Sequence, residues 1–328
     1  MLAKTIERIG LLTSGGDAPG MNAAIRAVVR TAIYNGVEVT GVEGGYSGLL
    51  EKRFADMQPH SVSKIISQGG TILKSSRCPE FKRPEVRAMA YENMRNSGIN
   101  ALIVIGGDGS LQGANLLCKE FGLPVVGIPG TIDNDIYGTD KTIGFDTSVN
   151  TAVSAIDKIK DTADSHNIIF FVEVMGRHSG FIAINTAISC GAEATLIPEV
   201  HTDIDALCNY MDDGRRKNKT SGIVVVAEGE DGGGAINVAE RVKERLPTYD
   251  IRVTTLGHIQ RGGSPTNGDR VLASVLGYEA VKALLVGRTG VMVGQVRGEI
   301  LFTSLDDVTT RRNEIDRSWI EINRILSL

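Results

Sequence analysis

The chain has 328 residues, more than one compact core usually holds, and this length predicts two domains or one large α/β body with a subdomain. Apolar residues make up 42% and charged residues 23%, which excludes a disordered, collagenous or coiled-coil protein. The net charge of −4 disfavours a nucleic-acid partner, because proteins that bind duplex DNA more often carry a basic surplus.

Short apolar runs recur along the chain, and each leads into a glycine-rich segment. We expect strands over 9–12, 37–42, 101–105, 125–128, 168–174, 223–227 and 253–256. Runs of Val and Ile without alternation are typical of strands buried on both faces. Apolar residues at helical spacing over 22–34 and 146–163 predict helices. This alternation predicts parallel sheets between layers of helices, with the glycine-rich segments gathered at the carboxyl edge, where ligands bind.

The cysteines show no CxxC spacing; they are Cys78, Cys118, Cys190 and Cys208. A zinc site or a disulfide scaffold is therefore disfavoured, and a reducing cytosol is the simplest setting. Charged residues interrupt the N-terminal segment before a signal-peptide core develops, and no run approaches the ~20 apolar residues that a membrane-spanning helix needs. We expect a soluble, cytoplasmic protein that does not bind membranes.

The segment 13–22, TSGGDAPGMN, follows the first predicted strand. Its small residues would let the backbone approach an anion, which N–H groups at the start of the next helix can bind. No GKS or GKT is present, so the segment is not a Walker loop. A tight strand–helix turn explains the pattern equally well.

The segment 106–110, GGDGS, lacks the spacing of a dinucleotide fingerprint, since Gly113 comes one position late. Asp108 inside this turn would repel a pyrophosphate unless a cation lay between them. Because Mg²⁺ prefers one or two carboxylates together with phosphates, a magnesium-bridged polyphosphate is one interpretation, and an Asx-turn is the other.

Two carboxylates, Asp133 and Asp135, follow the strand predicted at 125–128. In an extended segment both would face the same way, and such a pair suits a general base beside a metal-bound anion. A polar loop that caps helices is the alternative. The GGDGS loop ends the preceding strand, and this coincidence favours the functional interpretation.

Basic residues gather in later glycine-rich segments. His258 and Arg261 lie in GHIQRGGSP with Arg252 just upstream, and Arg177 and His178 form a second pair after a strand. Arg and His together suit a phosphomonoester. No G-x-S-x-G, HExxH or protein-kinase motif is present, so phosphoryl transfer, which depends on positioning, Mg²⁺ and Arg, is the chemistry that fits.

Together these segments resemble the ATP-dependent 6-phosphofructokinases of the bacterial type, in the same order and over essentially the whole chain. The matching segments are LTSGGDAPGMNAAIR at 12–26, GGT at 69–71, IGGDGS at 105–110, PGTIDNDIYGTDKTIGFDT at 129–147, VEVMGR at 172–177 and LGHIQRGGSP at 256–265. GTIDND and GHIQRGGSP are highly specific to this family.

The resemblance implies two interleaved α/β domains, each a mostly parallel sheet flanked by helices, with the active site in the cleft between them. The nucleotide-binding domain would comprise 1–143 and 259–308, and the sugar-phosphate-binding domain 144–258 and 309–328. The enzyme would transfer the γ-phosphoryl group of Mg·ATP to the 1-hydroxyl of fructose 6-phosphate, in glycolysis, as a homotetramer.

The resemblance also implies roles for residues at matching positions. Asp133 would be the general base, with Thr131 and Arg177 around the transferring phosphoryl group, and Asp108 would hold the magnesium ion. The nucleotide side would comprise Gly16, Tyr46, Arg77, Cys78, Gly107, Asp108, Gly109 and Ser110. The sugar-phosphate side would comprise Thr131, Asp133, Asp135, Met175, Gly176, Arg177, Glu228, Arg252, His258 and Arg261. An effector, ADP or phosphoenolpyruvate, would contact Arg26, Arg30, Lys160, Glu193, Lys217 and Lys219.

Two glycines bear on the phosphoryl donor. Pyrophosphate-dependent relatives carry Asp at the position of Gly109 and Lys at that of Gly130. An Asp at 109 would block the space that the α-phosphate of ATP needs, so this chain resembles the ATP-using branch.

The chain departs from the family at several positions. Ile168 stands where the family places an arginine that reaches the 6-phosphate of a neighbouring subunit's substrate, and Cys78 replaces an aromatic residue beside the nucleotide. Pro59 and Lys160 stand at positions of effector arginines. Ile168 keeps one alternative open, the same chemistry on another ketose phosphate. Another alternative is a catalytically impaired paralogue that binds nucleotide or sugar phosphate as a regulatory subunit, and Asp108, Asp133 and Arg177 argue against it. An NAD-dependent dehydrogenase is a weaker alternative.

Overall fold

The computed structural model describes residues 6–216 and 220–327, and the chain divides into two compact units. The first unit comprises 1–132, 136–146 and 261–313, and the second comprises 133–135, 147–260 and 314–328. Residues 133–135 thus stand with the second unit, whereas the expected first domain ran without a break to residue 143. Helix α5 (Phe145–His166) begins in the first unit and continues into the second.

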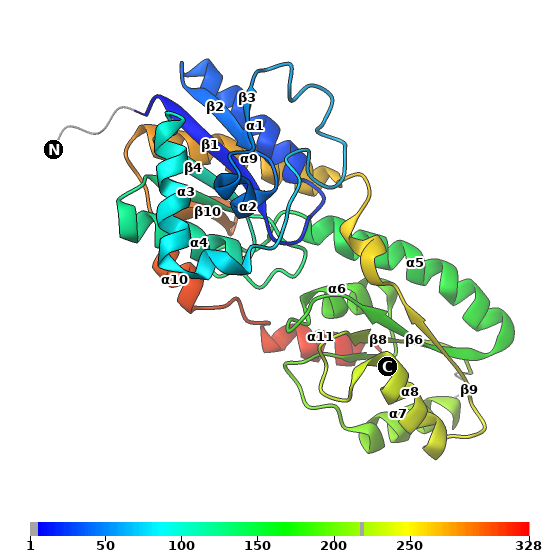
Figure 1. The fold of residues 1–328 in the computed structure, drawn as a ribbon. Coiled ribbons are helices and arrows are strands. Elements are labelled where there is room, and N and C mark those ends of the chain that lie inside the picture. Colours follow the sequence, from blue (N-terminus) through cyan, green and yellow to red (C-terminus); the bar gives the residue numbers. More distant parts are fainter. Residues whose placement is uncertain (1–5, 217–219, 328) are drawn as a thin grey trace. The chain divides into compact units, whose positions relative to one another are not determined.

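The first unit is built on a seven-stranded sheet in the order β11-β10-β5-β4-β1-β2-β3 (Figure 1). Strands β2, β1, β4, β5 and β10 run parallel, and β3 and β11 are antiparallel strands at the two edges. The bounds are β1 Arg8–Ser14, β2 Glu38–Val42, β3 Phe54–Met57, β4 Ala101–Gly106, β5 Val125–Pro129, β10 Val291–Val296 and β11 Glu299–Ser304. Every residue of β4 and β5 is buried, as expected for central parallel strands covered on both faces.

Two groups of helices cover this sheet. Helices α1 and α9 pack against each other, whereas α2, α3, α4 and α10 form the other group (Figure 1). The bounds are α1 Met21–Tyr34, α2 Gly45–Leu50, α3 Pro84–Asn96, α4 Asp108–Phe121, α9 Asn267–Leu285 and α10 Leu305–Thr310, with a short 3-10 helix, η1, at Pro79–Lys82. Gly122 caps the C-terminus of α4 with a φ of +60°, and its N–H donates to the Cys118 carbonyl.

The second unit contains a four-stranded parallel sheet in the order β7-β8-β6-β9. Its strands are β6 Ile168–Val174, β7 Ala194–Leu196, β8 Gly222–Ala227 and β9 Asp250–Thr255. Its helices are α6 Phe181–Cys190, α7 Ile204–Arg216, α8 Gly234–Arg245 and α11 Arg317–Leu326, and the 3-10 helix η2 spans Gly257–Arg261. A buried cluster that includes Phe171, Val224 and Val238 joins the sheet to α7 and α8.

All seven expected strands and both expected helices are present, and the predicted fold class of two mostly parallel sheets flanked by helices is confirmed. The expectation of burial on both faces is wrong for β9, which is an edge strand with Asp250, Arg252 and Val253 exposed. Strands β3, β7, β10 and β11 were not expected. Strands β3 and β7 are short, β11 alternates in exposure, and Gly294 and Gln295 interrupt the apolar run of β10.

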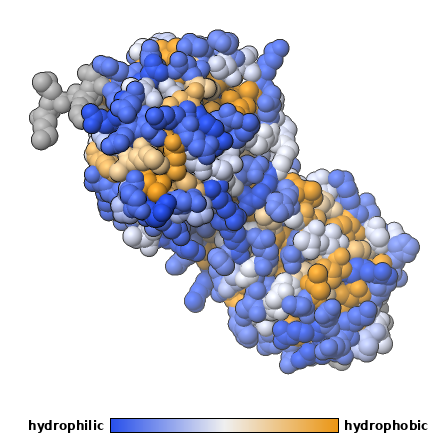
Figure 2. Space-filling model, in the orientation of Figure 1, coloured by the Kyte–Doolittle hydropathy of each residue, from blue (hydrophilic) through white to orange (hydrophobic). Residues whose placement is uncertain are grey.

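The face of the molecule drawn in Figure 2 is mostly hydrophilic, with apolar patches between the polar side chains. Among the described residues, none of the helices combines the length and the hydropathy that crossing a membrane requires.

Candidate active site

The loops that follow β1 and β4 pack directly against each other at the carboxyl edge of the first unit's sheet. A Cβ at Gly106 would lie 2.6 Å from both the Ser110 hydroxyl and the Ser14 carbonyl oxygen, so only glycine fits there. Gly15, with φ +86°, also faces the Ser110 hydroxyl. The structure therefore brings the first glycine-rich segment and the GGDGS segment together, as the parallel sheet predicts.

A third loop, residues 69–78, is hydrogen-bonded to the loop that follows β1. Thr13 Oγ1 donates to the Lys74 carbonyl at 2.8 Å, and Ser75 Oγ donates to the Gly15 carbonyl at 2.5 Å. Arg77, which is exposed, and Cys78, which packs on the apolar core, follow directly in the chain. These bonds hold the segment with Arg77 and Cys78, both predicted for the nucleotide side, beside the loop that follows β1.

Asp108 and Gly109 open helix α4 and are both exposed, while Gly107 is the N-cap residue. N–H groups of a first helical turn point toward the solvent at the helix start, where they attract anions. A Cβ at Gly109 would meet no atom within 4 Å. The helix start therefore presents an open, unobstructed surface with one carboxylate at its edge.

Tyr46 lies beneath this surface rather than on it. Its side chain is buried, its hydroxyl donates to the Ser110 carbonyl, and its ring stacks on Phe81 with centroids 4.1 Å apart. Burial raises the pKa of Tyr46, so the hydroxyl stays a hydrogen-bond donor. Gly113 leaves room for the ring, since a Cβ there would lie 2.8 Å from it. Tyr46 thus supports the GGDGS loop from within.

Arg261 lies over the first loop of the same unit. Its Nη1 atom donates to the Asp17 carbonyl at 3.2 Å, and a Cβ at Gly16 would stand 2.4 Å from that nitrogen. Gly16 was predicted for the nucleotide side and Arg261 for the sugar-phosphate side. The structure brings the two together, so the guanidinium group contacts the backbone of the nucleotide-side loop.

The segment after β5 carries Thr131 and the predicted base. Thr131 is buried and lies against Gly107, because a Cβ added at Gly107 would lie 3.6 Å from the Thr131 Cβ. Asp133 is 3% exposed. The expectation of an extended segment that points Asp133 and Asp135 the same way is wrong, because Asn134 between them adopts a left-handed φ of +56°.

Asp133 and Arg177 form an ion pair within the second unit, with 3.5 Å between the Arg177 Nε and Asp133 Oδ2 atoms. The Arg177 side chain is 55% exposed, so its remaining donors are accessible to a ligand. Glu228 fixes the backbone there, because its Oε1 atom accepts the Arg177 N–H at 2.8 Å and the Gly176 N–H at 3.3 Å. Arg177 itself has a left-handed φ of +54°, and this double acceptor holds that conformation.

Other residues of the predicted sugar-phosphate side occupy different environments. Met175 is buried and His258 is exposed on η2. Asp135 is partly buried. Arg252 on β9 forms a bidentate ion pair with Asp250, so it is not an isolated cation.

The predicted effector residues are brought together only in part. Arg26 and Arg30 lie one turn apart on α1, where burial, with a smaller effect of the Arg30 charge, lowers the pKa of Arg26. Lys160 Nζ donates to the Cys190 carbonyl at 2.8 Å. Glu193 is partly buried beside Gly222, and Lys217 and Lys219 lie outside the described residues.

Two residues of this region escaped the sequence analysis. Ser179 is buried and its hydroxyl donates to the Asp133 carbonyl at 3.0 Å. Gly229 packs against the Arg177 carbonyl, and a Cβ there would lie 1.7 Å from that oxygen. The available signal was position alone: Ser179 follows the Arg177-His178 pair, and Gly229 follows Glu228 at the end of a predicted strand.

A magnesium ion fits this donor set through Asp108. In the part of the chain that the structure describes, no three His, Cys, Asp or Glu side chains converge on one point. An ion held by one or two carboxylates together with substrate phosphates needs no such cluster. The exposed carboxylate at the start of α4 is therefore a suitable protein ligand.

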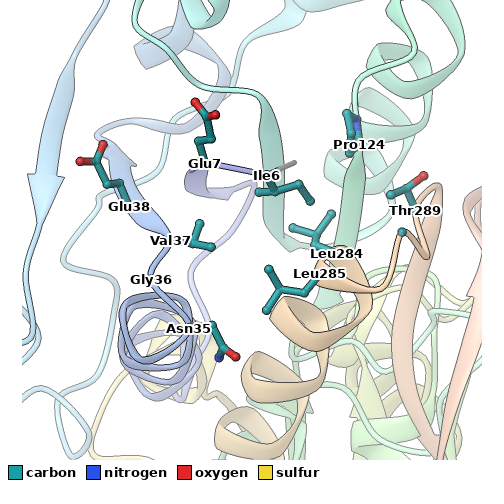
Figure 3. Close-up of a pocket in the computed structure, with 11 residues that line it drawn as sticks. Ile6, Glu7, Asn35, Gly36, Val37, Glu38, Pro124, Leu284, Leu285 and Thr289 are labelled. Carbon is teal, nitrogen blue, oxygen red and sulfur yellow. The ribbon is translucent and has the colours of Figure 1, made fainter. Parts of the chain in front are cut away.

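A separate cavity of about 880 Å³ opens at the opposite edge of the same sheet (Figure 3). Its lining comes from the segments that precede β1, β2, β5 and β10, among them Glu7, Val37, Pro124 and Leu284. Parallel α/β sheets bind ligands at the carboxyl ends of their strands, and this cavity lies at the amino ends. It is therefore distinct from the candidate active site.

Comparisons with known proteins agree on one family. The sequence matches the family described as Phosphofructokinase over residues 8–284. It is 53% identical over 324 residues to ATP-dependent 6-phosphofructokinase 2 of Bacteroides thetaiotaomicron, with 99% of each chain covered. It is 52% identical over 323 residues to ATP-dependent 6-phosphofructokinase 1 of Thermus thermophilus, covering 98% of this chain and 100% of the relative.

A solved structure gives the same result. Phosphofructokinase from Saccharomyces cerevisiae superposes with a TM-score of 0.87 and 38% identity over 92% of this chain. This chain spans 45% of that longer chain, so the similarity covers slightly less than half of the yeast polypeptide.

Proposed function

Because the chain belongs to the phosphofructokinase family, we infer that it catalyses the ATP-dependent phosphorylation of fructose 6-phosphate. The γ-phosphoryl group of ATP is transferred to the 1-hydroxyl of the sugar, and the products are fructose 1,6-bisphosphate and ADP. The reaction is a step of glycolysis. Within this chain, the observation that carries the proposal is the buried Asp133 carboxylate 3.5 Å from the Arg177 guanidinium.

Asp133 is the proposed general base. An ionised carboxylate accepts the proton of the 1-hydroxyl as the oxygen attacks the γ-phosphorus, which gives the sugar oxygen its nucleophilic character. The Ser179 hydroxyl, bound to the Asp133 carbonyl at 3.0 Å, fixes the backbone that carries this carboxylate. Arg177 holds the carboxylate through Nε, and its other N–H groups are available to the oxygens of the phosphoryl group in transfer.

The nucleotide side is proposed to be formed at the carboxyl edge of the first unit's sheet. The start of α4 supplies N–H groups and positive dipole charge for phosphates, and Arg77 and Arg261 lie on the two loops bound to the segment after β1. Asp108 is the proposed protein ligand of Mg²⁺, which neutralises charge on the β- and γ-phosphates when it is bound. Gly109 leaves the space beside α4 open, and this supports ATP rather than pyrophosphate as the donor.

The sugar-phosphate side is proposed to lie on the second unit. Arg252 and His258 supply positive charge or donors for the 6-phosphate, Glu228 binds the Arg177 backbone, and Met175 directly follows β6. Assembly into a homotetramer, an effector site for ADP or phosphoenolpyruvate, and a cytoplasmic location remain predictions from the sequence.

A coupled assay of the purified protein tests the proposed function. ATP and pyrophosphate are compared as donors, and fructose 6-phosphate and sedoheptulose 7-phosphate as acceptors, with and without Mg²⁺. We expect turnover with Mg·ATP and fructose 6-phosphate to exceed the other combinations. A preference for pyrophosphate, or for the seven-carbon sugar, would overturn the assignment of donor or acceptor.

A further inference from the structure

Arg252 and Asp250 form a bidentate ion pair on strand β9. Arg252 Nε donates to Asp250 Oδ1 at 2.9 Å, and Nη2 donates to Oδ2 at 3.2 Å. The two residues are two positions apart on an edge strand, so both side chains project from the same face of the sheet. The side chains are 61% and 49% exposed, which leaves the pair open to a competing anion.

The neighbouring strand supplies no second arginine to Asp250. In the parallel register of β6 and β9, Ile168 lies opposite Asp250 and Phe170 lies opposite Arg252. The bond from Arg252, and after it the charges of Arg252 and Lys243, lower the pKa of Asp250, so the carboxylate is ionised at neutral pH. Ile168, opposite Asp250, has no side-chain donor, so the carboxylate forms its ion pair with Arg252.

We propose that Asp250 is a positioning residue that sets the affinity for the sugar phosphate, by competing with the phosphate for the Nε–Nη2 edge of Arg252. This inference rests on the proposed role of Arg252 in binding that phosphate. The Nε–Nη2 edge is one of the two edges with which a guanidinium binds an oxyanion bidentately. A phosphate that binds through this edge must displace Asp250, whereas one that binds through the Nη1–Nη2 edge lies close to the Asp250 carboxylate.

The expected size of the effect follows from the exposure of the pair. Exposed ion pairs contribute little to stability, so their displacement costs roughly two- to fivefold in affinity. The ionised carboxylate also repels a phosphate dianion that binds beside it, which acts in the same direction. Removing the charge at position 250 should therefore strengthen binding rather than weaken it.

The test is Asp250→Asn, measured by steady-state kinetics and by equilibrium binding of fructose 6-phosphate to the full-length protein. We expect the half-saturating and dissociation constants for fructose 6-phosphate to fall roughly two- to fivefold, with those for ATP and kcat unchanged. Asp250→Glu keeps the carboxylate and should behave as the wild type. Asp205→Asn is the matched control, since Asp205 also pairs with an exposed arginine, Arg245, at 2.6 Å, and should leave both substrates unaffected.

Arg252→Ala separates this inference from the proposed function. We expect that variant to bind fructose 6-phosphate more weakly, and Asp250→Asn to give a smaller gain when combined with it, because only the charge repulsion then remains to be relieved. If Arg252→Ala weakens binding but Asp250→Asn leaves the constants unchanged or raises them, the competition is wrong and the role of Arg252 stands. If Arg252→Ala does not affect binding, the assignment of Arg252 to the sugar phosphate is itself wrong.

Discussion

Gly229 lies directly against the carbonyl oxygen of Arg177, so close that a Cβ at position 229 would stand 1.7 Å from that oxygen. The same backbone is fixed from its other side by Glu228, which accepts the Arg177 N–H at 2.8 Å. Arg177 adopts a left-handed φ of +54° and still reaches Asp133. The dipeptide Glu228-Gly229 therefore holds the proposed phosphoryl-binding arginine in a conformation that it would not adopt unaided.

Gly229→Ala should shift the Arg177 backbone and lower kcat roughly ten- to a hundredfold, since displacement of a catalytic group by about 1 Å has effects of this size. Steady-state kinetics with a circular dichroism check measure it. Gly191→Ala is the control for stability, because alanine is strained at its positive φ of +59°, but a Cβ there meets no atom within 4 Å. Equal losses in both variants would show that Gly229 acts through stability and not through Arg177.

Asp133→Asn keeps the shape of the side chain but removes the proton acceptor. We expect kcat to fall by about 10²–10⁴-fold while ATP binding and the fold survive. Asp135→Asn makes the same chemical change two residues away and should cost less, because the left-handed Asn134 separates the two side chains. A protein that keeps most of its turnover without the Asp133 carboxylate would remove Asp133 from the role of base.

Gly109→Asp should cripple the use of ATP through bulk and charge near the α-phosphate. The fold should tolerate it, since a Cβ at Gly109 meets no atom within 4 Å. Gly109→Ala adds volume without charge and should have the smaller effect. Pyrophosphate use need not appear, because Gly130 lacks the lysine and a Cβ there would already be 3.0 Å from Ile105. Undiminished ATP turnover in Gly109→Asp would show that the α-phosphate does not pass this residue.

Activation by ADP should be weak or absent. Pro59 has no donor in its side chain, and Lys160 cannot form the bidentate fork of an arginine and already donates to the Cys190 carbonyl. An aldolase-coupled assay, which leaves added ADP intact, measures the response. The double variant Pro59→Arg, Lys160→Arg should respond more strongly to ADP. Strong activation of the wild type at micromolar ADP would contradict the prediction.

Ile168→Arg should lower the half-saturating concentration of fructose 6-phosphate by roughly ten- to a hundredfold at most, the value of one charge-assisted contact to phosphate, with little change for ATP. The register places the new guanidinium beside Asp250, where it would also draw the carboxylate away from Arg252. Ile168→Leu is the control for packing, because Ile168 is 8% exposed. An unchanged or poorer response to the sugar would mean that residue 168 does not face the substrate.

The sequence alone determined the fold class of the protein and most of its central strands. Apolar runs such as 101–105 and 168–174 form strands because both faces of those strands are buried, so their local composition is sufficient to identify them. The hairpin of β10 and β11 was missed. Arg297 and Gly298 at its turn both have positive φ, as hairpin turns require, but the sequence does not show those angles directly. The residues of the candidate site stay predictions, made from short glycine-rich segments with fixed spacing and from the family resemblance.

The tertiary structure decided which of those residues act on one another. Gly229 contacts Arg177 across 52 positions because β6 and β8 are neighbours in register, with Val174 opposite Ala227. Tyr46 proved to be a buried support of the GGDGS loop, and Arg252 proved to be bound by Asp250. Strand propensity depends on nearby residues, whereas strand neighbours and register depend on the burial of the whole sheet. For that reason no local pattern could have given the contacts of Gly229 with Arg177 and of Tyr46 with the Ser110 carbonyl, whereas Asp250 and Arg252 are only two positions apart on one strand.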